Sequence, residues 1–314
     1  MDGYAPTVVC LGECMVELRT RPDGLLTRSF GGDTLNTAVY LTRLGIRTEY
    51  VTALGDDDFS SDMVHAWEKE GVGTAHVQRL PGFLPGLYII ETDAAGERRF
   101  LHWRDSAPVR RIFDPLHVEA VEAALLTADV LYLSGITLSL FRGDARERLL
   151  ASLGRARAAG IRVVFDTNFR ARGWPDRSEA SRIYDRVLAL CHTVLAGVDD
   201  FREMEGAASP EQLLARLDRL GVSESVLKLS DPGCLVHHEG ITESVPVPVS
   251  VVAVDTTAAG DSFAAGYLAA RLFGEGPAAS ARAGHDVAAR VIRHAGAIVP
   301  LDAMPPARPP RRSA

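Results

Sequence analysis

The sequence predicts an α/β fold: a mostly parallel, Rossmann-like sheet flanked by helices, with a small β-sheet lid formed by insertions. Short, almost continuously apolar β-branched runs recur along the chain, and helical patterns separate them. Strands buried on both faces have this composition, and their alternation with helices is typical of parallel sheets covered on both sides. One stretch departs from this alternation, because two strand-like runs are joined there by a short turn containing glycine. This pattern predicts a hairpin and hence the lid.

The apolar runs and the helical stretches between them give the order of the main domain. Apolar residues from Leu35 onward recur at helical spacing and stop at Gly45, a residue favoured after a helix end. Strands are expected at 7–11 (TVVCL), 50–54, 130–133, 161–165, 193–195 and 225–229. Helices are expected at 35–45, 59–71, 115–127, 144–159, 178–190, 210–220, 260–272 and 277–294.

The hairpin consists of residues 86–92 (GLYIIET) and 98–103 (RRFLHW), joined by 93–97. Residues 13–20 and the stretch around 29–30 are expected to add strands to it. We therefore expect one domain over residues 1–304, with a lid from about 13–32 and 84–106. Residues 305–314 are rich in Pro and Arg, and we expect them to be disordered.

Composition limits the functions to be considered. The 314 residues are 46% hydrophobic, enough for a core, and carry 34 Lys and Arg against 41 Asp and Glu, a net charge of −7. This balance argues against nucleic acid or a membrane surface as partner. No apolar run approaches the about 18 residues of a membrane span, and the first residues do not resemble a secretory signal. The four scattered cysteines indicate buried, reduced thiols and a cytoplasmic protein. They are Cys10, Cys14, Cys191 and Cys234.

One segment has the residues of a phosphate site. Residues 255–268 read DTTAAGDSFAAGYL, and the small side chains of Ala258, Ala259 and Gly260 let backbone N–H groups crowd together at a helix start. Such a group of N–H donors binds phosphate, and Asp261 in the first turn is placed to act as a base toward an alcohol. The alternative is an ordinary capping aspartate after a small-residue loop. The sequence contains neither the Gly-x-x-x-x-Gly-Lys-Ser/Thr motif nor the Gly-x-Gly-x-x-Gly motif, which argues against P-loop and dinucleotide sites.

A second segment, residues 31–36 (GGDTLN), places two glycines before a helix. The glycines leave the backbone open to a ligand, and Asp33 and Asn36 are suited to hydrogen-bond hydroxyl groups. The alternative is again a capped helix N-terminus.

Together the two segments resemble the two signatures of the ribokinase-like (PfkB) carbohydrate kinase family, and the resemblance covers nearly the whole chain. Within the family, the chain is most similar to the kinases of 2-dehydro-3-deoxy-D-gluconate. The segments that carry this likeness are GECMVEL (12–18), VTALGDDDFS (51–60), LPGLYIIETDAAGERRFLHWR (84–104), YLSGITL (132–138) and FDTNFRARGW (165–174).

The resemblance implies ATP-dependent phosphorylation of this sugar acid at O6, with Mg²⁺, and leaves a monovalent cation near Asp255 open. It implies that Asp261 is the general base and that residues 258–260 form the anion hole. Sugar-acid contacts are expected at Gly32, Asp33, Thr34, Leu35, Asn36, Tyr88, His102, Trp103, Arg104, Arg170 and Asp261. Nucleotide contacts are expected at Asn168, Lys228, Ser230, Gly233, Ala258, Gly260 and His285, and a metal-linked carboxylate at Asp200.

The residues also support a sugar acid independently of the resemblance. An acidic protein that binds an anion needs local cations, and Arg104 and Arg170 are suited to a planar carboxylate, unless each is only a surface salt bridge. Two departures from the family pattern are Ser230, in place of the first glycine of the nucleotide loop, and Asp200, where glutamate is usual.

The alternatives are a kinase of a neutral sugar such as fructose and a non-catalytic sugar-acid binding protein. The free edges of the lid are a candidate surface for a homo-oligomer.

Overall fold

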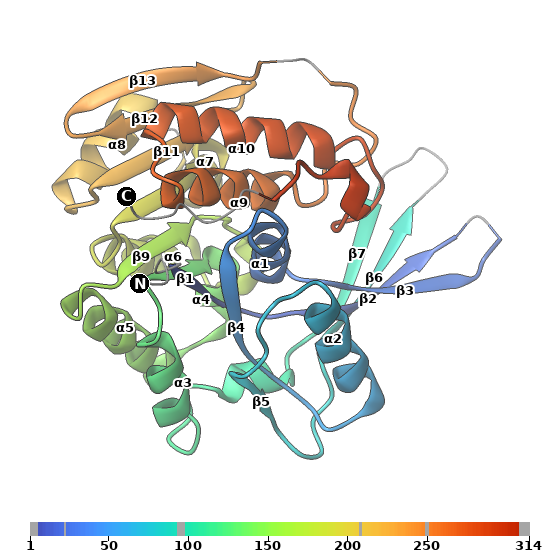
Figure 1. Cartoon of the computed structure of the whole chain (residues 1–314). Helices are drawn as coiled ribbons and strands as arrows, with labels where there is room; N and C mark the ends of the chain where they lie inside the picture. Colours follow the sequence, from blue (N-terminus) through green and yellow to red (C-terminus); the bar gives the residue numbers. More distant parts are fainter. Residues whose placement is uncertain (1–5, 22, 93–97, 207–208, 249–250, 308–314) are drawn as a thin grey trace, which may run out of the picture.

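The computed structural model describes residues 6–21, 23–92, 98–206, 209–248 and 251–307. Figure 1 shows its elements coloured in chain order, from blue at the N-terminus to red at the C-terminus. The strands are β1 (Thr7–Leu11), β2 (Met15–Thr20), β3 (Leu26–Gly31), β4 (Arg47–Leu54), β5 (Val77–Arg79), β6 (Leu87–Thr92), β7 (Arg98–Trp103), β8 (Val130–Ser134), β9 (Arg162–Asp166), β10 (Thr193–Gly197), β11 (Glu224–Lys228), β12 (Gly233–His238) and β13 (Ile241–Pro246). The helices are α1 (Asp33–Arg43), α2 (Asp58–Lys69), α3 (Val118–Leu125), α4 (Gly135–Leu140), α5 (Gly143–Ala158), α6 (Arg177–Leu188), α7 (Val198–Glu205), α8 (Pro210–Arg219), α9 (Ala259–Leu272) and α10 (Pro277–Val291), with 3₁₀ turns at Pro108–Arg111, Ala171–Gly173 and Leu301–Ala303.

The main sheet has the strand order β13-β12-β11-β10-β9-β8-β1-β4-β5 among the described residues. Neighbouring strands from β11 to β5 run parallel, and β12 and β13 are antiparallel. The α/β fold with a mostly parallel sheet is therefore confirmed. The carboxyl ends of its parallel strands form one edge, and open α/β sheets bind their ligands at such an edge.

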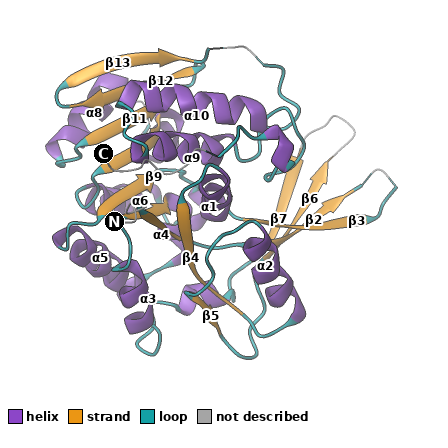
Figure 2. Ribbon diagram, in the orientation of Figure 1, coloured by secondary structure: helices purple, strands orange, loops and turns teal. Residues whose placement is uncertain are grey.

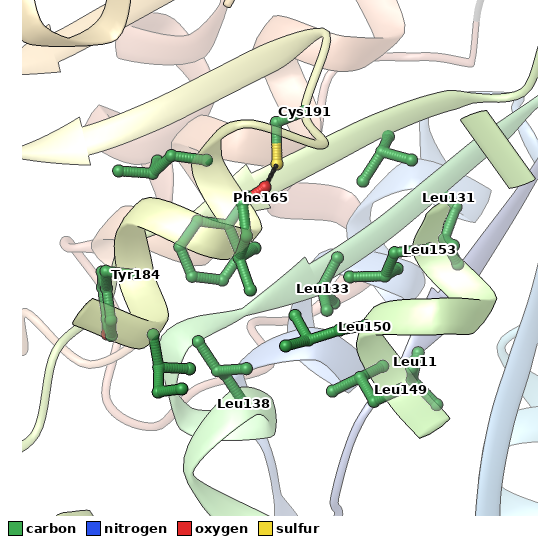
Figure 3. Close-up of a cluster of buried hydrophobic side chains, with 14 of the residues drawn as sticks. Leu11, Leu131, Leu133, Leu138, Leu149, Leu150, Leu153, Phe165, Tyr184 and Cys191 are labelled. Atoms are coloured by element: carbon green, nitrogen blue, oxygen red, sulfur yellow. Dashed lines mark hydrogen bonds between the residues drawn. The ribbon is translucent and has the colours of Figure 1, made fainter. Parts of the chain in front are cut away.

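Helices cover both faces of this sheet, as Figure 2 shows. Alternate residues of β1 explain why: Val9 and Leu11 join one buried cluster, and Val8 and Cys10 join the other. The first cluster includes side chains of α3, α5 and α6, and the second includes side chains of α1, α2, α9 and α10. Figure 3 shows part of the first cluster, where the thiol of Cys191 donates to the carbonyl of Val187 at 3.1 Å.

Two glycines set the position of α9, the helix that begins at the small-residue segment. A Cβ on Gly266 would lie 2.9 Å from the carbonyl oxygen of Ala283, and one on Gly284 would lie 2.8 Å from that of Phe263. Helices α9 and α10 therefore pack with their backbones close together, and neither position has room for a side chain. None of the described helices is long and apolar enough to cross a membrane.

The lid is a second sheet with the order β3-β2-β6-β7, and it projects from the main body (Figure 1). The hairpin of β6 and β7 is as expected, although its turn at 93–97 lies outside the described residues. Cross-strand partners point to the same face of a sheet. Ser29 pairs with Glu17, Glu17 with Tyr88, and Tyr88 with His102, so one row crosses all four strands.

The sequence prediction differs from the structure in a few elements. The strand expected at 50–54 is the second half of β4, and the helix expected at 277–294 ends at Val291. The short elements α4, α7, β5, β12 and β13 were not predicted. Helix α4 reads GITLSL, a strand-like run, and it begins after Ser134, whose side chain caps it by accepting from the N–H of Thr137. Of the tail expected to be disordered, residues 308–314 lie outside the described part of the chain.

Candidate active site

The first turn of α9 is an open helix N-terminus. Its N-cap, Ala258, has a left-handed backbone with φ of 60°, and no side chain caps the helix. The N–H of Ala259 donates to the carbonyl of Thr256 at 3.2 Å, and the other first-turn N–H groups are not used by a capping side chain and can face an anion. Asp261 lies in this turn, as the sequence predicts for a base beside an anion site.

Helix α1 hydrogen-bonds both the side chain and the backbone of Asp261. The amide of Asn36 donates to its Oδ2 at 2.8 Å, and the hydroxyl of Thr37 donates to its backbone carbonyl at 3.3 Å. Burial first, and then the nearby Asp33 carboxylate, raise the pKa of Asp261 to about 8, while the amide of Asn36 acts in the opposite direction. A carboxylate with a raised pKa is a stronger base than a free aspartate, which suits proton abstraction from an alcohol.

Asp33 is oriented by an amide as well. The side chain of Asn168 donates to its Oδ2 at 2.8 Å, and the backbone of Asn168 is left-handed with φ of 26°. This contact connects Asn168, expected on the nucleotide side, to the sugar segment. Asp33 and Asp261 thus each have one oxygen fixed by an amide from another element.

The other members of the sugar segment face different surroundings. Thr34 is fully buried and shares a hydrogen bond with the hydroxyl of Tyr50 at 3.1 Å, and Leu35 packs into the core. Only their backbones are therefore available to a ligand. A Cβ on Gly32 would lie 2.2 Å from the carbonyl oxygen of Glu13, so the close approach of these two segments requires glycine there.

The lid contributes the row across its strands. The hydroxyl of Tyr88 donates to Glu17 Oε2, and the Tyr88 ring stacks on His102 with 5.6 Å between ring centroids. Burial and then the charge of Arg104 keep the pKa of His102 below its usual range. The side chain of Trp103 is 56% exposed and points to the opposite face of the lid from Tyr88 and His102.

The two arginines expected to bind a carboxylate lie in different surroundings. Arg104 follows β7 and forms an ion pair with the buried Glu13. Arg170 follows β9, is exposed, and donates to the carbonyl of Phe169 at 2.7 Å. Their convergence on one carboxylate stays a prediction.

Lys228, at the end of β11, lies beneath the anion site. Its Nζ contacts both carboxylate oxygens of Asp166 at 2.9 and 3.1 Å and is 3.9 Å from the position of a Cβ on Gly260. Burial works against the charged form of Lys228, but Asp166 and Asp200 outweigh it and raise its pKa. Lys228 is therefore an ammonium ion close to the place where phosphate would bind.

The remaining nucleotide-side residues are engaged within the protein. Ser230 donates to Asp199 at 2.7 Å, and Gly233 opens β12 with φ of 141°. The imidazole of His285 is buried, 3.3 Å from the carbonyl oxygen of Val245 and 3.6 Å from the thiol of Cys234. Their nucleotide contacts stay predictions.

The candidate metal residue is Asp200, whose carboxylate accepts from Thr167 at 2.5 Å and has its pKa raised by burial. In the part of the chain that the structure describes, no group of three or more His, Cys, Asp or Glu side chains could hold a metal. The candidate cation residue Asp255 accepts from the N–H groups of Thr257 and Gly296, each at 2.9 Å.

Sequence reasoning did not assign three charged residues of this region: Glu13, Glu17 and Asp166. Glu13 and Asp166 had a usable signal, because each lies at the carboxyl end of a predicted buried strand. Glu17 had none, because its partner Tyr88 is set by the parallel pairing of β2 with β6.

The fold and this edge of the sheet together define a kinase that transfers a phosphoryl group to a small hydroxylated acceptor. Residues 5–304 match the pfkB family carbohydrate kinases. The chain belongs to this family, and it is a sugar kinase.

Several relatives share nearly the full length of the chain. The 2-dehydro-3-deoxygluconokinase of Dickeya dadantii is 43% identical over 306 residues, covering 95% of this chain and 98% of the relative. The enzyme of the same name from Escherichia coli K12 is 42% identical with the same coverage. Among solved structures, a PfkB protein from Polaromonas sp. JS666 has a TM-score of 0.82 at 25% identity, covering 92% of this chain and 96% of that one. A 2-dehydro-3-deoxygluconokinase from Thermotoga maritima has a TM-score of 0.82 at 22% identity, covering 95% and 96%, which shows the shared fold.

Proposed function

We propose that this kinase phosphorylates 2-dehydro-3-deoxy-D-gluconate at O6, with ATP as the phosphoryl donor. The observation that supports this best is the 43% identity, over 95% of the chain, to an enzyme named for this reaction. The site agrees with it, since an acceptor with a carboxylate requires a cation near the lid and Arg104 lies there.

Binding of the acceptor uses the lid and α1. Arg104 binds the carboxylate through charged hydrogen bonds, which are stronger than neutral ones. Asp33 and Asn36 hydrogen-bond hydroxyl groups, and Asn36 has a buried Oδ1 that accepts no hydrogen bond within the described residues. Tyr88 and His102 form the wall of the lid above the sugar.

Proton transfer falls to Asp261. As O6 attacks the γ-phosphorus, the new O6–P bond forms and the bond from phosphorus to the β–γ bridging oxygen breaks, so that ADP leaves with the electron pair. The O6 proton passes to the Asp261 carboxylate. Asn36 occupies one oxygen of this carboxylate at 2.8 Å, which leaves the other for O6. Because the transition state of phosphoryl transfer is loose, alignment and charge stabilisation do most of the work.

Charge stabilisation comes from the anion hole at residues 258–260, where the N–H of Ala259 also donates to the carbonyl of Thr256 at 3.2 Å, and from Lys228 beneath it. The buried carboxylate of Asp200 would hold the water shell of a Mg²⁺ ion, which prefers to bind mainly through nucleotide phosphates and water. When bound, the ion would offset phosphate charge. Closure of the lid excludes water and so limits ATP hydrolysis.

The lid also supports a proposal on assembly. Its outer strands β3 and β7 each have a free edge among the described residues, and each exposes apolar side chains: Leu26 on β3, and Phe100 and Trp103 on opposite faces of β7. We propose that two copies pair there, and light scattering on the purified protein measures the resulting mass. The four cysteines are buried free thiols, which supports the expected cytoplasmic location.

The experiment that tests the function measures ADP release with the keto-deoxy acid, with fructose, and with no acceptor. We expect rapid ADP release only when the keto-deoxy acid is the acceptor. Rapid ADP release only with fructose as the acceptor would favour the neutral-sugar alternative. The galactonate-derived acid, which differs at one stereocentre, completes the set of acceptors.

A further inference from the structure

Glu13 is a buried carboxylate at the carboxyl end of β1 to which the mechanism above gives no role. The residue is 3% exposed, and neither carboxylate oxygen has a hydrogen-bond partner among the described residues. In the part of the chain that the structure describes, its one ion pair is with Nη2 of Arg104. A buried carboxylate without hydrogen bonds is costly unless neighbouring charges compensate it.

Two guanidinium groups supply this compensation. Burial raises the pKa of Glu13 while Arg104 and Arg110 oppose that rise, and Asp33 adds to it. Arg110 also fixes the backbone, because its Nε donates to the carbonyl of Arg104 at 3.0 Å. The contact from Arg110 to Asp105 is long, 3.8 Å, and Asp105 is fully exposed, so water screens that pair. Arg104 and Arg110 therefore both act on one enclosed carboxylate, and Glu13 alone does not neutralise both guanidinium groups.

The position of Glu13 connects the sugar segment to the lid. A Cβ on Gly86, just before β6, would lie 3.1 Å from Glu13 Oε1 and 3.3 Å from Cβ of Arg104. On the other side, the carbonyl of Glu13 closely approaches Gly32. The side chain of Arg104 is 21% exposed, and its buried Nε and Nη2 make no hydrogen bond within the described residues, although Nη2 forms the ion pair with Glu13. The guanidinium is thus held on one side and free on another.

We propose that Glu13 is a positioning residue for the acid subsite: its carboxylate holds Arg104 so that the free N–H groups face the substrate carboxylate. This inference rests on the proposed function, because it requires an anionic acceptor. An arginine side chain loses rotamer freedom when it binds a ligand, and a side chain already held in place loses less. Glu13 therefore lowers KM for the acid and has little part in the chemical step.

The test is a double-mutant cycle on the full-length enzyme with Glu13→Gln, Arg104→Met and the double variant. We expect Glu13→Gln to raise KM for the keto-deoxy acid by roughly 10- to 30-fold, the effect of freeing one arginine side chain. Turnover should stay within about twofold, since the base is untouched. In the Arg104→Met background, Glu13→Gln should not raise KM further, because the residue acts through Arg104.

Two further variants separate positioning from folding. Glu49→Gln is the matched control: Glu49 is a 16% exposed glutamate on β4, also with an unpartnered buried oxygen, and its replacement should change neither constant. If Glu13→Gln does not fold, Glu13→Asp keeps the charge and should raise KM by a smaller factor. An unchanged or lower KM in Glu13→Gln would overturn the positioning role. An equal rise in KM when Glu13→Gln is made in the wild-type and in the Arg104→Met background would overturn it as well. The proposed function fails separately, if the wild-type enzyme does not phosphorylate the acid at all.

Discussion

The raised pKa of Asp261 makes the pH dependence of catalysis the most informative perturbation. Only the ionised carboxylate accepts the O6 proton, so kcat/KM should increase with pH through the pKa of the free enzyme. With that pKa at about 8, about one tenth of the enzyme has the ionised base at pH 7 and about nine tenths at pH 9, so kcat/KM should rise about tenfold between them.

Two variants shift this profile in opposite directions. Asp33→Asn removes the second cause of the raised pKa and should move the rise to lower pH, whereas Asn36→Leu removes the donor to Asp261 and should move it to higher pH. The assay is coupled ADP release at saturating ATP, with kcat/KM for the acid measured from pH 6 to 9.5. A profile that is flat over this range, or that moves in the same direction in both variants, would refute the assignment of Asp261 as the base.

Three other predictions test separate parts of the site. Asp261→Asn keeps the shape of the side chain but removes the base, so kcat should fall by roughly 10²–10⁴ while sugar binding, measured by calorimetry, persists; near wild-type turnover would contradict this. Arg170→Leu should raise KM for the acid by roughly 10- to 100-fold if Arg170 reaches the carboxylate, with partial recovery in Arg170→Lys. Equal losses on acid and neutral sugar would instead place Arg170 with the nucleotide or the fold. Hydrogen exchange in β6 and β7 should slow when the acid binds, because the lid has only a small core of its own, and exchange that does not change would argue against closure.

The sequence predicts the main architecture because strands and helices here have strong local patterns. The buried strand at 7–11 and the helix after Gly32 depend on apolar spacing, and each appears in the structure within a few residues of its predicted bounds. The short helix α4 has no such pattern, since its six residues resemble a strand and its start depends on one serine cap.

The site is predictable only in part, because local sequence does not determine partners far apart in the chain. Asp261 and the small residues before it are adjacent in sequence, and the structure places them at the start of α9 as expected. The pairs Glu17 with Tyr88 and Glu13 with Arg104 depend on how the lid folds over the sheet. The exposed position of Trp103 follows from strand alternation relative to Tyr88, which the pairing of β6 with β7 fixes.

The most direct test of a sugar-acid kinase is a competition in one reaction. The enzyme, ATP and Mg²⁺ are mixed with equal concentrations of 2-dehydro-3-deoxy-D-gluconate and fructose, and the products are identified by mass spectrometry and ³¹P NMR. We predict that the keto-deoxy acid is consumed first and that its phosphate is on O6. Phosphorylated fructose as the main product, with the acid left unchanged, would contradict the account.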